Sequence, residues 1–283
     1  MNISDFLQKI VDWLAAHRFI NVLLITAYFL FIYYMHDPVV HLSVWVMNFF
    51  TLAVYNKVVI AVIILFLILF IAFLASQLKA HRDNLKLKLI YLFITLTLIV
   101  IHFHIMFEMN IEIIHIFEFP FLALLLFPLT RRLGATLFFT IPFMLLDEWH
   151  QYIVLYPATV DYLELNDIVM DIYGAGLAMT ALLICGLKGE KKVKSLWTRT
   201  EFISLVACML LIVIAVKLCF VSVYAAGKCD NTLLVLNRIP GAQNFWRQFP
   251  GRDVIYHVMQ PVEAFIYIPL LTLFYFGLDS FRK

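Results

Sequence analysis

The chain contains several apolar runs, each long enough to cross a lipid bilayer. A spanning helix needs roughly 20 predominantly apolar residues, because backbone polar groups in the hydrocarbon layer must be hydrogen bonded within the protein. Hydrophobic residues make up 64% of the 283 positions and charged residues only 14%, values that soluble domains rarely approach. The sequence therefore predicts an all-α, polytopic membrane protein. Its eight predicted transmembrane helices cover residues 17–35, 57–77, 87–107, 111–129, 134–156, 166–187, 202–224 and 257–278.

The distribution of Lys and Arg predicts the orientation of these spans. With eight spans and both termini cytoplasmic, fifteen of the 21 basic residues fall on the inner side and six on the outer side. Positive charge accumulates in cytoplasmic loops, so this topology is favoured, with the bacterial inner membrane as the expected location. A further crossing at the apolar segment 39–55 would place the basic residues of 79–88 outside. We therefore interpret 39–55 as an interfacial segment, and 3–14 as an amphipathic interfacial helix.

Composition also excludes several classes of protein. The net charge is only +2 and no basic run is present, which excludes a nucleic-acid partner. The first apolar run lacks a small-residue cleavage site, so we interpret it as a retained span. Three of the four cysteines fall in predicted spans and none forms a C-x-x-C pair, a pattern that favours neither a disulfide framework nor a zinc knuckle.

Acidic residues and histidines gather on the outer side, where thirteen of 19 acids and seven of nine histidines lie. Span four begins IEIIHIFEFP, and the spacing of Glu112, His115 and Glu118 places them on one helical stripe. The other polar groups in the outer halves of spans are Asp147, Glu148, His150 and Gln151 in span five, Asn166, Asp167 and Asp171 in span six, and His257, Gln260 and Glu263 in span eight.

Placing these carboxylates together at one depth is costly unless a cation or shared protons offset their charge. We therefore predict that the residues of spans four to six converge on one outward-facing polar cavity. A structural interpretation is favoured for some of the remaining residues. His102, His104 and Glu108 are expected at the interface, Asp161 and Glu164 as solvated loop acids, and Lys217 as a snorkelling or acid-paired lysine.

Three short motifs resemble those of the VanZ-like membrane proteins, whose pattern is E-x-x-H-x-x-E-Y, then D-E-x-x-Q, then R-x-x-D-x-x-D-x-x-x-N-x-x-G. EIIHIFEF, DEWHQ and DYLELNDIVMDIYG match them in order, within three spans and about a quarter of the chain. Asp161 replaces the arginine and Asp171 the asparagine, so the site is more acidic than the pattern. The resemblance implies cell-envelope biology at the outer leaflet, including glycopeptide resistance, more than it implies a reaction.

The chain thus divides into residues 1–110 with the amphipathic helix and three spans, a VanZ-like core at 111–187, and two spans at 188–283. The last part contains a long extracytoplasmic loop, 225–256, whose aromatic residues favour a folded lid.

Two classes of function are compatible with these residues. The first is a metal-dependent enzyme acting on a lipid or lipid-linked envelope substrate, in which a divalent metal polarises a phosphoryl or acyl oxygen and activates water. The predicted metal ligands are His115, Glu118, Asp147, Glu148 and Asp167, and the candidate catalytic residues are Glu148, Asp147, His115 and Asp167. The candidate substrate-binding residues are Gln151, His150, Asp171, Glu112, Arg247 and Arg252. The loop residues Lys228, Arg238, Arg247 and Arg252 are expected to meet an anionic headgroup.

The second class is non-enzymatic: a factor that binds envelope lipids or confers glycopeptide resistance, or a cation- or proton-coupled transporter. Buried carboxylates are typical of ion-coupled carriers, but the one-sided distribution of the acids favours a one-sided site.

Overall fold

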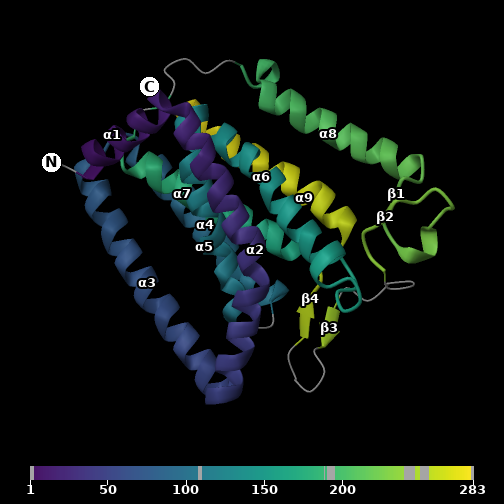
Figure 1. Ribbon diagram of the computed structural model, residues 1–283. Coiled ribbons are helices and arrows are strands. Elements are labelled where there is room, and N and C mark those ends of the chain that lie inside the picture. Colours follow the sequence, from purple (N-terminus) through teal and green to yellow (C-terminus); the bar gives the residue numbers. More distant parts are fainter. Residues whose placement is uncertain are drawn as a thin grey trace.

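The computed structural model describes residues 3–107, 110–187, 189, 195–238, 246–248 and 255–281, and it is predominantly helical (Figure 1). Seven of its helices are long and apolar enough to cross a membrane, which confirms the predicted helical class. The longer helices are α1 (Ile3–Ala16), α2 (Arg18–Phe50), α3 (Leu52–Ala80), α4 (Leu85–Met106), α5 (His115–Thr130), α6 (Leu133–His150), α7 (Leu165–Ile184), α8 (Thr200–Lys217) and α9 (Pro261–Phe276).

Short elements connect these helices. The short helical segments are η1 (Asn110–Ile114), the π-helix η2 (Gln151–Leu155), η3 (Leu196–Thr198), η4 (Ala225–Gly227) and η5 (Gly277–Phe281). Strands β1 (Val221–Ser222) and β2 (Leu234–Val235) pair in parallel, and β3 (Trp246–Gln248) and β4 (Ile255–His257) pair antiparallel.

Helix α2 is much longer than the predicted span 17–35, because it continues without a break through most of segment 39–55. Pro38 lies inside it, and a single proline removes one backbone hydrogen bond without ending a helix whose following residues stay apolar. The chain turns at Thr51, and α3 begins at Leu52 and not at 57. A helix of 33 residues is about 50 Å long, whereas the hydrocarbon layer is about 30 Å thick. The α2 helix is therefore long enough to cover both the predicted span and most of the segment predicted to remain outside the crossing.

The predicted span 134–156 forms α6 followed by η2, and α6 is not among the seven sufficiently apolar helices. The reason is local, because its last four residues are Asp147, Glu148, Trp149 and His150. Asp147, Glu148 and His150 are nevertheless buried inside the bundle, whereas Trp149 is exposed.

Helices α5, α6 and α7 pack at the centre of the bundle, and α7 is almost completely buried. Glycines permit this packing, as expected for the small residues of α7. A Cβ added at Gly174 would overlap the backbone of Ile116 in α5, and one at Gly176 would overlap the ring of Tyr275 in α9. By contrast, α3 and α8 lie at the edges of the bundle and bury few residues (Figure 1).

Charged side chains connect the helix ends at the end of the bundle nearest α1. The side chain of Arg132 pairs with Glu201 and lies 3.6 Å from Asp279, which is also 3.6 Å from Arg199. Asp279 accepts a hydrogen bond of 3.0 Å from the backbone N–H of Gly134. Opposite charges are therefore paired where α5, α6, α8 and η5 meet. This is the end predicted to be cytoplasmic.

A disulfide joins Cys219 and Cys229, which corrects the expectation that the cysteines are unpaired. Sequence spacing alone did not suggest the bond. The segment after α8 folds back on itself through β1 and β2, which brings the two Cα atoms to 5.9 Å. The same segment is hydrogen bonded to the connection between α6 and α7, since Leu163 N–H donates to Leu236 O and Arg238 N–H to Asp161 O.

Candidate functional site

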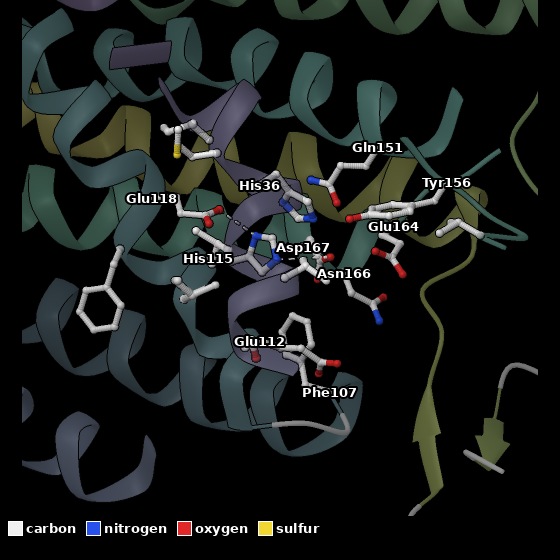
Figure 2. A pocket seen from close by; sticks show the side chains of 18 of the residues that line it. His36, Phe107, Glu112, His115, Glu118, Gln151, Tyr156, Glu164, Asn166 and Asp167 are labelled. Atoms are coloured by element: carbon white, nitrogen blue, oxygen red, sulfur yellow. Dashed lines mark ion pairs between the residues drawn. The ribbon is translucent and has the colours of Figure 1, made fainter. Parts of the chain in front are cut away.

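A cavity of about 590 Å³ lies between α2, α5 and the segments at the outer end of the bundle. The polar side chains of its lining come from five parts of the chain. They are Tyr28, His36, Ser43, Glu112, His115, Glu118, Gln151, Tyr156, Tyr162, Glu164, Asn166, Asp167 and Tyr256. Figure 2 shows His115 between Glu118 and Asp167, with His36, Gln151 and Glu164 directed toward the same space.

His115 is the central side chain of this cluster. It is the first residue of α5 and is buried against α7. Its Nδ1 atom lies 3.4 Å from a carboxylate oxygen of Glu118 and 3.3 Å from one of Asp171. Its Nε2 atom lies 3.5 Å from a carboxylate oxygen of Asp167. Both nitrogens of one imidazole therefore face acids, and the i, i+3 pair inferred from the sequence is present.

Helix α6 contributes two fully buried carboxylates, those of Asp147 and Glu148. The Gln151 side-chain amide donates to Asp147 at 3.1 Å and to Glu148 at 3.2 Å. The second oxygen of each carboxylate is also buried, and within the described residues neither has a hydrogen-bond partner. A buried carboxylate oxygen without a donor is costly, so these two atoms mark a place where a cation or a proton is required.

Two groups of side chains bring potential ligand atoms within 4.8 Å of one another. One group is His115, Glu148 and Asp167, and the other is His115, Glu118 and Asp171. Side chains of predicted spans four, five and six therefore meet, although Asp147, Glu148 and Asp171 are not among the residues that line the cavity. Both groups combine imidazole with two carboxylates, a donor set that suits zinc or manganese. Asp147 belongs to neither group, and its role as a metal ligand stays a prediction.

Glu164 lines the cavity, which corrects its interpretation as a solvated loop acid. The sequence places it in a loop, but backbone hydrogen bonds at Asp161 and Leu163 hold this loop against the segment before Arg238 and turn Glu164 inward. Burial and the nearby Asp167 carboxylate raise the pKa of Glu164 to about 8. Asp161, two residues before Leu163, is exposed, as predicted for a solvated loop acid.

Arg238 is a structural residue in this arrangement. It donates to the backbone oxygens of Tyr152, Pro157 and Val160, and it lies over the ring of Tyr152 at 4.0 Å. Its guanidinium is therefore occupied in holding the loop at the mouth of the cavity. This geometry gives no support to the prediction that Arg238 meets an anionic headgroup.

The other predicted substrate-binding residues occupy different positions. Gln151 and Glu112 line the cavity, whereas Asp171 is fully buried behind His115, and His150 stacks on the ring of Tyr33 at 3.7 Å. Arg247 lies over the ring of Tyr162, a tyrosine that lines the cavity. Arg252 is outside the described residues.

The sequence interpretation missed the contribution of α2. His36 lines the cavity, and the neighbouring Asp37 accepts a hydrogen bond of 3.1 Å from the hydroxyl of Tyr156. A signal was present, because an imidazole and a carboxylate interrupt an apolar run at this point of the chain. His36 and Asp37 lie outside the three motifs, and the spacing of residues within α2 does not indicate which other helix these two side chains face.

Residues expected at the interface differ in their surroundings. His102 is buried, and its Nε2 atom lies 2.9 Å from the backbone oxygen of Asn166. It therefore contacts the start of α7 and does not face water. His104 and Lys217 are exposed, and Glu108 is outside the described residues.

Comparison of the chain with protein-family models, with curated proteins and with solved structures finds no match. The resemblance to the VanZ-like proteins therefore rests on the three short motifs alone.

Proposed function

We propose that this chain is an integral membrane protein that binds one divalent cation between His115, Glu148 and Asp167 and uses it to hydrolyse a lipid or lipid-linked envelope substrate. The observation that carries the proposal is the convergence of three buried ligands beside a cavity large enough for a substrate. It is supported by the buried oxygen of Glu148, which has no hydrogen-bond partner within the described residues.

The arrangement around His115 suits this role. Asp167 faces Nε2, while Asp171 and Glu118 face Nδ1. In metal sites the second nitrogen of a ligating histidine usually donates to a carboxylate, which fixes the tautomer and makes the imidazole a stronger ligand. We therefore favour the Nε2 side as the cation position, with Asp171 as the group that positions the ring.

A cation held there would supply Lewis-acid chemistry: it would polarise a phosphoryl or acyl oxygen and lower the pKa of a bound water. The residues of the chain would exclude bulk water and hold the substrate, since Gln151, Asn166 and Glu164 line the adjacent cavity. Hydrolysis is the simplest reaction for such a site, because it needs only the substrate and water.

A lipid-binding factor without catalysis is the second candidate. It is favoured by the lining of the cavity, because a large part of it is apolar side chains of α2 and α5. Transport is less well supported, because the paired charges of Arg132, Arg199, Glu201 and Asp279 close the other end of the bundle.

The test is the metal content of the purified protein and of two variants. Wild type and Asp161→Asn, which alters an exposed acid, should contain stoichiometric divalent metal by elemental analysis, and Glu148→Gln should lose it. Because Glu148→Gln also removes a buried negative charge, the variant should be at least as heat-stable as chelator-treated wild type. Wild-type protein without metal and with a stability indifferent to chelators would overturn the metal site. Mass spectrometry of membrane lipids incubated with metal-loaded protein would then distinguish an enzyme from a binding factor.

A further inference from the structure

The cavity has a polar part and an apolar part, and the two are ordered along the bundle. Helix α5 runs from His115 to Thr130, beside which Arg131 lies 2.7 Å from Asp12 of α1. Phe117 and Phe121, which line the cavity, are therefore on the inward side of His115. Glu118 lies between these two rings on α5, whereas most of the other polar groups of the cavity lie at or beyond the outer end of this helix.

Helix α2 lines the cavity with apolar side chains on both sides of His36. It runs outward from Arg18, so Phe31 and Ile32 are on the inward side of His36, and Val39, Val40 and Val44 are on its outward side. The hydroxyl of Tyr28 donates to the backbone oxygen of Glu118, and its ring contacts Phe121 at 6.2 Å. These contacts join α2 to α5 at the inward end of the cavity.

The apolar part opens sideways between these two helices. Phe31 and Phe121 both line the cavity, yet each is 58% exposed. When α2 and α5 span a bilayer, this opening faces the hydrocarbon layer. A molecule with its polar end outward and its chain inward, the orientation of a lipid in the outer leaflet, fits this arrangement.

The charge of the polar part restricts the headgroup. Four carboxylates line the cavity, those of Glu112, Glu118, Glu164 and Asp167, and among the described lining residues none is lysine or arginine. An anionic group would meet these acids, with only neutral donors and the imidazoles of His36 and His115 beside them, whereas an ammonium group would find opposite charges.

We infer that this cavity binds an outer-leaflet lipid with an ammonium-bearing headgroup, whose chain lies between α2 and α5. The inference rests on the proposed membrane orientation and names the substrate class of the proposed site. It does not depend on the metal.

The experiment measures lipid binding to the delipidated, purified full chain by native mass spectrometry, with chelator present. The probes are phosphatidylethanolamine and phosphatidylglycerol with identical acyl chains, which differ in the ammonium group. Wild type should prefer the amine lipid by about tenfold, a difference typical of a partly buried charge pair. Glu112→Gln, which removes an acid from the lining of the cavity, should reduce this preference, and Asp161→Asn should leave it unchanged. Equal binding of the two lipids, a preference for phosphatidylglycerol, or equal effects of the two variants would overturn the headgroup assignment.

A second pair of variants tests the position of the chain. Met35 lines the cavity and is 40% exposed, so the larger side chain of Met35→Trp should fill the apolar part of the cavity without overpacking the core. The affinity for both lipids should then fall by about tenfold. Val22, on the same helix and 49% exposed, is outside the lining, and Val22→Trp should bind both lipids as wild type does. Equal lipid binding by Met35→Trp and Val22→Trp would overturn the proposed position of the lipid chain between α2 and α5. Glu148→Gln should lose metal and keep the lipid preference, so failure of the metal site and failure of the lipid site give different results.

Discussion

At the scale of single residues, the site depends on one imidazole with acids at both nitrogens. His115 can bind a cation through Nε2 only when Nδ1 carries the proton, and Asp171 is placed to accept that proton in a hydrogen bond, at 3.3 Å. Asp171 is fully buried and does not line the cavity, so it has no direct access to a ligand there. We therefore propose a positioning role for Asp171, which stands where the VanZ-like pattern has an asparagine.

We expect Asp171→Asn to weaken metal binding by roughly 10–100-fold, the usual effect of losing the partner of a ligating histidine. The affinity is measured by titration calorimetry of the purified, metal-free protein. Asp161→Asn is the matched control, because it makes the same chemical change at an exposed acid. If Asp171→Asn binds metal as tightly as wild type, then Asp171 does not position His115.

At the scale of elements, the site exists because α5 and α7 approach each other closely. Gly174 has no side chain, and the backbone of Ile116 occupies the space where a Cβ would lie. Ile116 follows His115 directly, so the same contact fixes the distance from His115 to Asp167 and Asp171. The glycine therefore couples helix packing to the geometry of the site.

Gly174→Ala should lower the free energy of unfolding by about 1–3 kcal/mol, because an added methyl group in a packed core forces the helices apart. Thermal unfolding in detergent measures this effect, and the metal affinity should decrease with it. Gly227→Ala is the control: its added Cβ meets only Ser222 Oγ, at 3.4 Å, and neither property should change. A Gly174→Ala protein as stable as wild type would show that α5 can move without loss.

At the scale of the whole molecule, the two ends of the bundle are chemically different. One end holds the acidic cavity, and at this end the segment that contains the disulfide between Cys219 and Cys229 is hydrogen bonded to the loop at Asp161 and Leu163. Disulfides persist in oxidising compartments, so this end is expected outside the cytoplasm. The other end pairs its basic residues with Asp12, Glu201 and Asp279, in agreement with the orientation inferred from the positive charges.

Cysteine labelling of intact cells tests this orientation. In a background with Cys208→Ser, which removes the exposed free thiol, Arg247→Cys should react with a membrane-impermeant maleimide. Arg82→Cys, in the turn between α3 and α4, should react only after the membrane is permeabilised. The reverse labelling would place the cavity on the cytoplasmic side of the membrane. It would also contradict the inference that the cavity binds an outer-leaflet lipid.

The sequence by itself determined the helical class, most of the helices and which polar residues share a helix face. These properties are local, because apolar runs and spacings of three or four residues fix the faces of a helix before it meets any other. It thus predicted the pair His115 and Glu118 on one helical stripe.

Only the tertiary structure decided which faces meet. It brought His36 and the apolar wall of α2 to the cavity, turned Glu164 inward, placed Asp171 behind His115 and paired Cys219 with Cys229. Each of these depends on contacts between segments far apart in the chain, and such contacts are set by packing and not by any local spacing.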